Sequence, residues 1–222
     1  MSSKKKIAQY QKQQEEARKK AAAKKIYLTL AIVISVVLIV STVTTIIAVS
    51  LSRRSFTVAL EVKDYGTITL EIYPEIAPRS ARAFKRYVES GFYDGLKFHR
   101  VIEDFMIQGG DPTGTGYGDP TLKNIKGEFS MNGFENDLDF TKGVIGLARG
   151  NDYDSATSQF FICHKDAPTL NGYYASFGIV VEGMDVVDAI ATCDKVESIT
   201  DQSGNQYVPA KDIIIERAYI VK

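Results

Sequence analysis

Two polar side chains capable of directed hydrogen bonds, Arg100 and Gln108, stand inside short apolar runs of the segment FHRVIEDFMIQGGD. Arginine is almost never buried without a partner or a role, so the pair is a candidate for a functional site. The apolar runs flank Glu103 and Asp104, a pattern typical of a two-stranded hairpin. Met106 and Gln108 then share one face of the second strand, and Arg100 can point to the same side. The segment predicts a cation and an amide above an apolar floor.

A second group of residues lies downstream and complements the first. Ala148 and Arg149 follow one predicted strand, Gln159 and Phe161 lie two apart on the next, and Leu170 lies in the loop beyond. Combined with the hairpin, these residues predict a shallow apolar cup that holds one cation and a few amides. The cup offers no general base and implies no metal or cofactor. It suits a reaction that needs neither proton transfer nor bond cleavage.

Other chemistries find little support in the sequence. His99 lies in a core-like strand and His164 follows the apolar run FFIC, and neither adjoins the G-x-S-x-G turn of a serine hydrolase. The run GGDPTGTGYG lacks the lysine of a phosphate-binding loop. The cysteines, Cys163 and Cys193, are too few for a disulfide framework, and we expect free thiols. Residues 52–222 carry 18 Lys/Arg against 25 Asp/Glu, a balance that disfavours binding to nucleic acid.

The N-terminal part of the chain has a different composition. Residues 1–25 hold nine Lys/Arg and two acidic residues, and the 25 residues Tyr27–Leu51 hold no charge. A helix of that length spans about 37 Å, enough to cross a hydrocarbon core of about 30 Å. We expect a transmembrane signal-anchor helix over 26–51, with the lipid bilayer as its partner along Tyr27–Leu51. A buried core helix and a cleaved signal peptide are the alternatives, but the apolar run is long for both.

Charges beside this span predict its orientation. Four lysines precede it closely, whereas only Arg53 and Arg54 follow it at once. The more basic side stays in the cytoplasm, so residues 1–25 are the expected cytoplasmic tail, which sets the topology or contacts anionic lipid head groups. Residues 52–55 are the expected linker. The domain at 56–222 is then expected on the other side of the cell membrane.

The remaining chain predicts a mainly β domain. Alternating or continuous apolar runs indicate eight strands, at 56–62, 66–74, 98–101, 105–108, 143–148, 158–163, 174–181 and 212–222. Helical spacing of apolar residues indicates two helices, at 77–91 and 183–193. Residues 109–143 have little periodicity and predict a long, functional loop region. A closed eight-stranded antiparallel barrel capped by two α-helices, preceded by the transmembrane helix, suits this set of elements.

The order of the motifs resembles one known family. FHRVIEDFMIQGGD, followed by GVIGLARG, SQFFIC and FGIVVEGMDVVDAI, is similar to the cyclophilin-type peptidyl-prolyl cis-trans isomerases over about Phe56 to Lys222. The family's fold, an eight-stranded barrel with two capping helices, agrees with the expected elements. By position, the resemblance implies that Arg100 and Gln108 are catalytic. It implies that the substrate is bound by Phe105, Met106, Ala148, Arg149, Gln159, Phe161, Leu170 and Tyr174.

Three positions depart from the family pattern. Arg149 stands where many members have asparagine, which adds charge at the rim of the pocket. Thr169 replaces a tryptophan known for contact with cyclosporin, which weakens the expectation that this chain binds cyclosporin. Tyr174 replaces a pocket histidine, and its ring can still form a wall of the proline pocket.

The resemblance implies rotation of X–Pro peptide bonds in unfolded or partly folded polypeptides. Given the anchor, we expect a membrane-bound isomerase, of bacterial origin, that aids the folding of exported or cell-surface proteins. The alternative is a non-catalytic module that keeps the barrel and uses the cup to hold proline-containing segments. Arg149, Thr169 and Tyr174 are the residues that favour this alternative.

Overall fold

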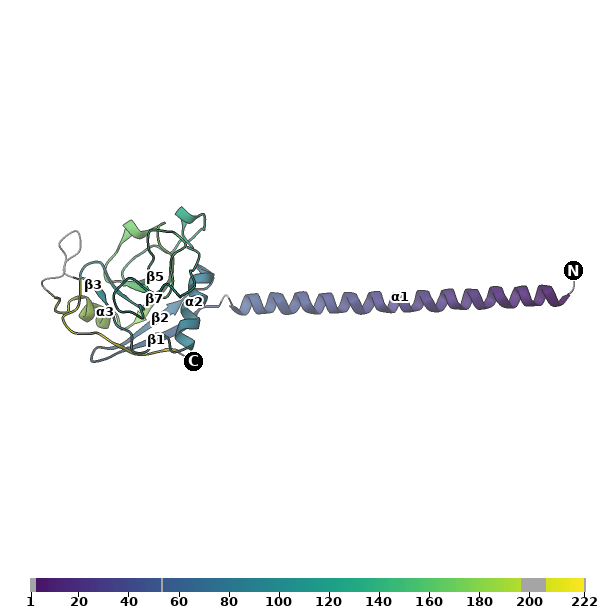
Figure 1. Ribbon diagram of the computed structural model, residues 1–222, viewed down its shortest axis with the longest axis horizontal. Helices are drawn as coiled ribbons and strands as arrows, with labels where there is room; N and C mark the ends of the chain where they lie inside the picture. Colours follow the sequence, from purple (N-terminus) through teal and green to yellow (C-terminus); the bar gives the residue numbers. More distant parts are fainter. Residues whose placement is uncertain (1–2, 53, 197–206, 222) are drawn as a thin grey trace. The chain divides into compact units, whose positions relative to one another are not determined.

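The computed structural model describes residues 3–52, 54–196 and 207–221, with the side chains of the first helix described over part of its length. The chain divides into two compact units, Met1–Ser52 and Arg53–Lys222, which are described separately below. The first unit holds the helix α1 (Ser3–Ser52), and the second holds all the strands (Figure 1).

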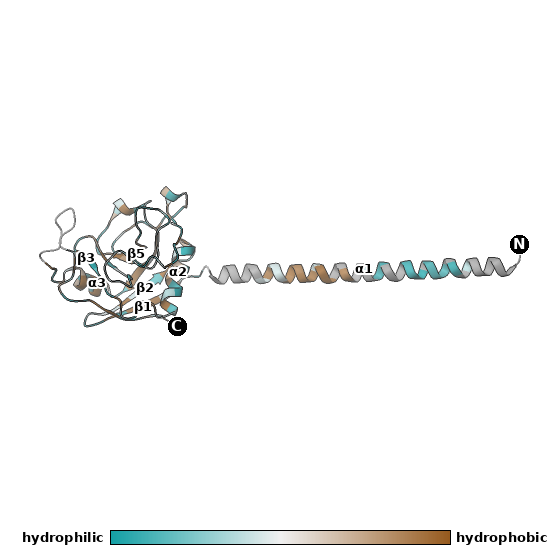
Figure 2. Ribbon diagram, in the orientation of Figure 1, coloured by the Kyte–Doolittle hydropathy of each residue, from teal (hydrophilic) through white to brown (hydrophobic). Residues whose placement is uncertain are grey.

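The first unit is one continuous helix whose described apolar side chains are exposed. Thr42 and Thr44 donate their hydroxyl hydrogens to the carbonyls of Ile39 and Val40, which satisfies these polar groups inside the apolar run. Figure 2 shows hydrophobic residues gathered along the middle of α1 and hydrophilic ones toward its N-terminal part. Within the described residues, no helix has a stretch both long and apolar enough to cross a membrane. The predicted span Tyr27–Leu51 includes side chains outside those described, at 29, 31, 32 and 45–51.

The second unit is an eight-stranded sheet in which every pair of neighbouring strands is antiparallel. In the described residues the order is β3-β4-β6-β5-β7-β2-β1-β8. The sequence predicts the number of these strands and their order along the chain. Most of the predicted strand ends lie within two residues of the observed ends. The bounds are β1 Phe56–Val62, β2 Gly66–Ile72, β3 Arg100–Ile102, β4 Met106–Gly109, β5 Val144–Leu147, β6 Phe160–Cys163, β7 Ser176–Glu182 and β8 Ile215–Ile220.

The prediction of a closed barrel is wrong at the seam between β3 and β8. These strands end the sheet order and form no ladder with each other in the described residues. The segments just before them are joined instead, through the isolated bridge of Lys97 with Ile214 and the hydrogen bond from the Phe98 N–H to the Ile213 carbonyl, 3.0 Å. Because β3 is only three residues long, no ladder extends along it at this seam. The sheet is therefore a curled, incompletely closed barrel.

Two helices cap the sheet, as the sequence predicts. The first, α2 (Pro78–Glu89), begins with a proline and buries Ala81, Phe84 and Val88 at helical spacing. The second, α3 (Met184–Ala191), buries Val186, Val187, Ile190 and Ala191. Phe84 contacts the rings of Tyr93, Phe160 and Phe177 with centroids 5.3–5.5 Å apart, so α2 joins the aromatic core of the barrel.

A glutamate from the long loop caps α2. The N-cap residue Ala77 has no side-chain oxygen, and the fully buried Glu128 supplies one from 48 residues away. Its carboxylate accepts hydrogen bonds from the backbone N–H groups of Arg79 and Ser80 and from the Ser80 hydroxyl, at 2.8–3.0 Å. The free N–H groups and the positive end of the helix dipole stabilise a carboxylate at this place. The contact therefore fixes residues 112–143 on the barrel.

The same region of chain is tied to β7. Asn136 donates to the carbonyls of Glu128 and Ser176, both at 2.9 Å, and the Ser176 hydroxyl donates to the Leu138 carbonyl at 2.6 Å. A short 3₁₀ turn, η1 (Ser130–Asn132), and a second one, η2 (Pro168–Leu170), interrupt the loops on this side. The long loop is thus held by side chains rather than by a sheet ladder.

Candidate active site

The β3–β4 hairpin places Arg100 directly opposite Gln108. The two residues are paired in the ladder, and Ile102 pairs with Met106. The turn includes Asp104 in the left-handed region, with φ of 59°. Side chains directly opposite in an antiparallel pair point to the same face, so the Arg100 Nη1 atom lies 3.4 Å from Gln108 Oε1 and 3.7 Å from Met106 Sδ. The cation and the amide predicted from the sequence do lie side by side.

A chain of amides continues from Gln108 across the sheet. Gln108 donates through Nε2 to Gln159 Oε1 at 2.8 Å, and Gln159 donates through Nε2 to the Gly116 carbonyl at 3.1 Å. Each amide thereby has a defined orientation, with the Gln108 oxygen turned toward Arg100. Such a chain presents the guanidinium and the amides in fixed directions, which is the requirement for electrostatic preorganisation.

A cavity of about 350 Å³ opens beside this pair. Met106 and Phe161 are buried in its floor, and the Phe161 ring is stacked on Phe140 with centroids 5.3 Å apart and meets Tyr174 edge-on at 5.7 Å. The cavity is lined by Arg100, Phe105, Met106, Gln108, Ala148, Arg149, Phe161, Leu170 and Tyr174. These are all the predicted site residues except Gln159, which lines an adjoining cavity of about 380 Å³. Thr169 lines neither cavity and is exposed.

Arg149 does not present an unengaged charge at the rim of this cavity. Its guanidinium carbon lies 4.7 Å from the ring centroid of Tyr174, 4.9 Å from that of Tyr153 and 5.4 Å from that of Phe129. Its Nε donates to the Tyr173 carbonyl at 3.0 Å, and its Nη1 donates to the Gly150 carbonyl at 2.8 Å. Cation–π contact and hydrogen bonds hold it against aromatic rings, so it joins the wall of the pocket to the loop of Tyr153.

The loop that borders Gln159 is organised around one carboxylate. Buried Asp111 accepts hydrogen bonds from the backbone N–H groups of Thr113, Thr115 and Gly116, at 2.9, 3.1 and 2.6 Å. Burial alone raises the pKa of Asp111, but hydrogen bonds from Thr113, Gly116 and Gly118 outweigh it and lower the pKa below its ordinary value. The ionised carboxylate therefore fixes the Gly116 carbonyl that receives Gln159.

His99 takes no part in this network. Its side chain is buried, and neither ring nitrogen has a hydrogen-bond partner among the described residues. Burial lowers its pKa. Asp111 and the Lys97 carbonyl raise the pKa by less, so the ring is neutral near pH 7. The other histidine, His164, accepts a hydrogen bond from the Asp104 N–H at 2.9 Å and supports the hairpin turn. Cys163 lies in β6, where burial raises the pKa of its thiol to about 12.

Several residues that lie around the site were not predicted from the sequence. Tyr117 lines the cavity next to Gln159, together with Asn124, Ser155 and Thr157. A further cavity, on the side of His99, is lined in part by Tyr207, Val208 and Pro209. These residues come from loops without periodicity, and the one local signal is a tyrosine set between two glycines at 116–118.

Comparison with known proteins agrees with this geometry. Residues 57–220 match the family model described as cyclophilin type peptidyl-prolyl cis-trans isomerase/CLD. A peptidyl-prolyl cis-trans isomerase of Streptomyces antibioticus is 45% identical over 164 residues, which cover 70% of this chain and 93% of that protein. A probable peptidyl-prolyl cis-trans isomerase of Brucella abortus is 37% identical over 165 residues, 69% of this chain and 81% of the relative.

Solved structures lead to the same family. The crystal structure of a Cryptosporidium parvum cyclophilin-type isomerase has a TM-score of 0.65 and 28% identity, and the match covers 76% of this chain and 99% of that one. A second structure, determined in the presence of the dipeptide Ala-Pro, has a TM-score of 0.64 and 29% identity, with coverage of 75% and 99%. Because the family model spans the barrel, from residue 57 to residue 220, the chain belongs to the cyclophilin-type peptidyl-prolyl cis-trans isomerases, and it is an enzyme of that activity.

Proposed function

We propose that Arg100 and Gln108 lower the barrier to X–Pro rotation by stabilising the twisted amide. The barrier arises from amide resonance and amounts to about 18–20 kcal/mol. Resonance is lost in the twisted state, where the nitrogen lone pair localises and can accept a hydrogen bond. The observation that carries the proposal is the guanidinium held between Gln108 Oε1 and Met106 Sδ at the edge of the 350 Å³ cavity. A donor fixed there favours the twisted amide over both planar forms.

The apolar residues of the cavity are proposed to hold the proline ring still while the X–Pro bond rotates. Phe105, Met106, Phe161 and Leu170 line the cavity and can bury the pyrrolidine ring. Gln108, Gln159 and the backbone near Ala148 are placed to hold the peptide on either side of the proline. When the flanking peptide is held and the pyrrolidine ring is buried, rotation is confined to the X–Pro bond between them.

Kinetics of site variants test this mechanism. For Arg100→Ala we expect kcat/KM on a proline peptide to fall about 100-fold, because a hydrogen bond a few kcal/mol stronger in the twisted state is lost. For Gln108→Ala we expect a fall of about tenfold, since the orientation of Arg100 and of Gln159 is relaxed. Lys123→Ala, an exposed change that lines none of the cavities, is the control. Activity of Arg100→Ala equal to that of the control would exclude the proposed role of Arg100.

We further propose that the enzyme is anchored in a bacterial cell membrane through Tyr27–Leu51, with the barrel outside the cytoplasm. Support comes from the 25 residues without charge, the basic leader before them and the exposure of the described apolar side chains around α1. A helix that is hydrophobic on all sides needs an apolar environment. Its clients are then exported or cell-surface polypeptides that fold after crossing the membrane.

The topology can be tested on cells. Protease added to intact cells, with the outer envelope made permeable where one exists, is expected to cut the barrel and to spare the tail of residues 1–25. The carbonate-washed membrane fraction is expected to retain the full chain. Protection of the barrel from the protease contradicts the orientation, and release by carbonate contradicts the anchor.

A further inference from the structure

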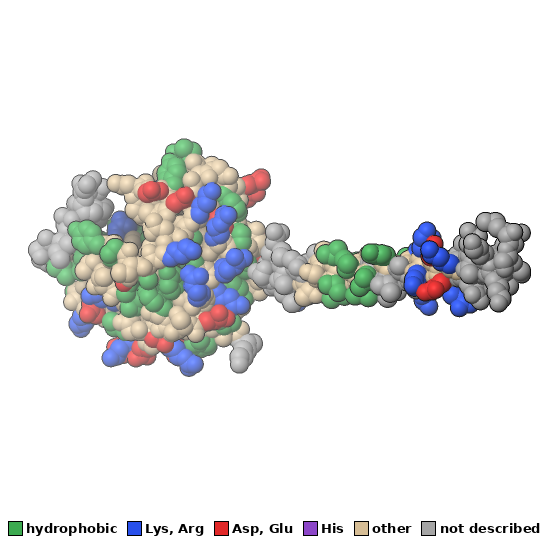
Figure 3. Space-filling view, turned by 45° about the vertical axis from the view of Figure 1, so that its right-hand side comes forward, with side chains coloured by type: hydrophobic (Ala, Val, Ile, Leu, Met, Phe, Trp, Pro, Cys, Tyr) green, Lys and Arg blue, Asp and Glu red, His purple; other side chains and the backbone are tan. Residues whose placement is uncertain are grey.

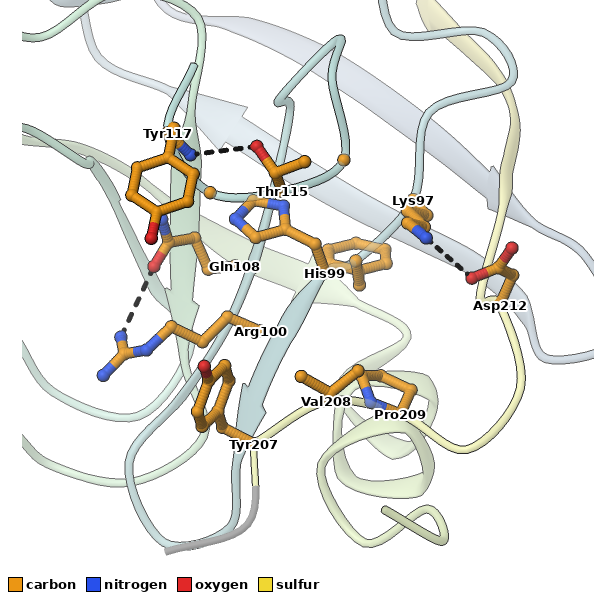
Figure 4. Close-up of a pocket in the computed structure, with 13 residues that line it drawn as sticks. Lys97, His99, Arg100, Gln108, Thr115, Tyr117, Tyr207, Val208, Pro209 and Asp212 are labelled. Carbon is orange, nitrogen blue, oxygen red and sulfur yellow. Dashed lines mark hydrogen bonds and ion pairs between the residues drawn. The ribbon is translucent and has the colours of Figure 1, made fainter. Parts of the chain in front are cut away.

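A third cavity adjoins the proposed proline pocket on the side of His99. Its volume is about 610 Å³, larger than that of the pocket itself. Arg100 and Gln108 line both cavities, so a peptide seated at this pair can reach either one. Figure 4 shows the cavity, with Arg100 and Gln108 on one side and Tyr207, Val208 and Pro209 on another. Adjacent α-carbons are 3.8 Å apart, so peptide residues within about three positions of a proline bound at Arg100 and Gln108 can reach this cavity.

One wall of this third cavity is formed by Tyr207, Val208 and Pro209, and the guanidinium of Arg100 lies at another side. Tyr207 and Val208 are half-buried and Pro209 is buried, and the Tyr207 carbonyl accepts a hydrogen bond from the Val101 N–H at 2.7 Å, which fixes the wall to β3. Lys97 and Asp212 stand at the opposite side, where the Nζ and Oδ1 atoms pair at 2.9 Å and offset each other. An aromatic side chain matches such a lining, because it packs against the apolar wall and the face of its ring attracts a cation.

His99 also lines this cavity, and its side chain is 7% exposed. Neither ring nitrogen has a hydrogen-bond partner among the described residues, and both nitrogens are closed off from solvent. His99 therefore gives the lining ring surface and no accessible hydrogen-bonding atom.

Tyr117 stands at the border between this cavity and the one beside Gln159. It lines both, and its side chain is 95% exposed, the largest value among the exposed apolar residues described. Gly116 and Gly118 on either side have φ of 87° and 77°, which glycine adopts readily. Because Asp111 holds the backbone of both glycines, the ring is presented on a fixed loop rather than on a loose one. Rigid exposed tyrosines are typical of binding surfaces.

We propose that the third cavity is a subsite for an aromatic side chain of the client within three residues of the proline. The ring packs between Tyr117 and the wall of Tyr207 and Val208. The inference rests on the proposed function, because the proline at Arg100 sets the register. It makes the enzyme selective among proline segments, with those that carry an aromatic residue at the right position isomerised in preference.

A scan of short peptides tests the subsite. The parent is Ala-Ala-Ala-Pro-Ala-Ala-Ala, and each alanine in turn is replaced by Tyr, by Leu or by Glu, with kcat/KM of isomerisation measured on the full chain in detergent. We expect Tyr at one position to raise kcat/KM about fivefold, mainly through a lower KM, with Leu weaker and Glu without gain. The ratio of the Tyr peptide to the parent peptide is the quantity to compare among variants.

Variants assign the gain to the cavity. Tyr117→Ala and Val208→Asp are expected to bring the ratio near one, and Tyr117→Phe is expected to retain it. Tyr219→Ala, a change of a half-buried tyrosine of β8 that lines none of the three cavities, is expected to keep both the ratio and the activity on the parent peptide.

The two proposals fail separately in this experiment. A ratio of one at every position, or a gain that survives both Tyr117→Ala and Val208→Asp, overturns the subsite while activity on the parent peptide stands. If Arg100→Ala keeps full activity on the parent peptide, the proposed mechanism fails. The subsite is then judged by titration alone, where tighter binding of the Tyr peptide than of the parent supports it and equal binding overturns it.

Discussion

At the scale of residues, the site depends on how each polar group is held. Arg100 and Gln108 are oriented by one another and by Gln159. Arg149, which the sequence presented as an extra charge at the rim, is instead enclosed by three aromatic rings and two carbonyls. Arg149, one of the three departures that favoured a non-catalytic module, therefore does not place an unpartnered charge beside the substrate.

Substitution of Arg149 tests this structural role. Arg149→Ala is expected to lower stability by about 1–2 kcal/mol, because cation–π contact and hydrogen bonds are lost. We expect KM to rise more than kcat falls, since Tyr174 loses support on the wall of the pocket. Arg149→Lys is expected to restore little, because an ammonium lacks the planar fork of guanidinium. Denaturant unfolding and steady-state kinetics measure both effects, and full rescue by lysine contradicts the account.

The buried neutral His99 makes stability depend on pH. Its pKa is lowered by burial in the folded state, so the unfolded chain binds a proton at higher pH than the folded chain does. Stability is then fully present above the unfolded pKa of about 6.5 and is lost as the pH falls below it. Urea unfolding between pH 7.5 and 5 is expected to show this loss, and His99→Gln to flatten it. If stability falls with pH equally in wild type and in His99→Gln, groups other than His99 cause the loss.

At the scale of elements, the sequence predicts what depends on periodicity. The alternation in FTVALEV and GTITLEI gives β1 and β2, and the apolar spacing after Pro78 gives α2. The hairpin of Arg100 and Gln108 follows from two apolar runs around a polar turn, so most of the candidate site is predictable once its strands are placed. These features are local, and they need only the neighbours along the chain.

Features that depend on residues distant along the chain cannot be predicted from local sequence patterns. The Glu128 carboxylate caps a helix 48 residues earlier in the chain, and the seam between β3 and β8 leaves the barrel incompletely closed. Tyr117 and Tyr207 line one cavity beside the site, although they lie 90 positions apart along the chain. No periodic pattern marks such contacts, because each depends on one side chain and a tertiary arrangement.

The cap on α2 provides a prediction at this scale. Glu128→Ala is expected to cost about 3 kcal/mol of stability, because two backbone N–H groups and the Ser80 hydroxyl lose a charged acceptor. Glu128→Gln is expected to cost less, since one acceptor oxygen remains. Glu135→Ala, an exposed change in the same loop, is the matched control and is expected to stay within about 0.5 kcal/mol of wild type. A denaturation curve of Glu128→Ala that matches the control excludes the cap as a stabilising contact.

At the scale of the whole molecule, we expect the two units to have separate tasks. All the residues that line the three cavities belong to Arg53–Lys222, and none belongs to the helix α1. Lys/Arg and Asp/Glu side chains both occur on the face of the second unit seen in Figure 3. The helix is then expected to set where the enzyme works and not how fast it works.

Removal of the helix tests this division. A chain of residues 54–222 is expected to isomerise the short alanine peptide with kcat/KM within about twofold of the full chain, because every lining residue is retained. Circular dichroism and the unfolding transition verify that the shortened chain is folded. A folded chain of 54–222 with activity reduced more than tenfold assigns a catalytic contribution to α1.

The central claim is that Arg100 accelerates rotation of the bound amide and does not merely hold the peptide. Exchange NMR on a proline peptide at equilibrium, with catalytic amounts of enzyme, measures cis–trans rotation directly, and a parallel titration gives the Kd. For Arg100→Ala the account predicts an exchange rate on the saturated enzyme about 100-fold below wild type, with a Kd within a few-fold. An unchanged rate on the saturated Arg100→Ala enzyme, with the whole loss in Kd, contradicts the account.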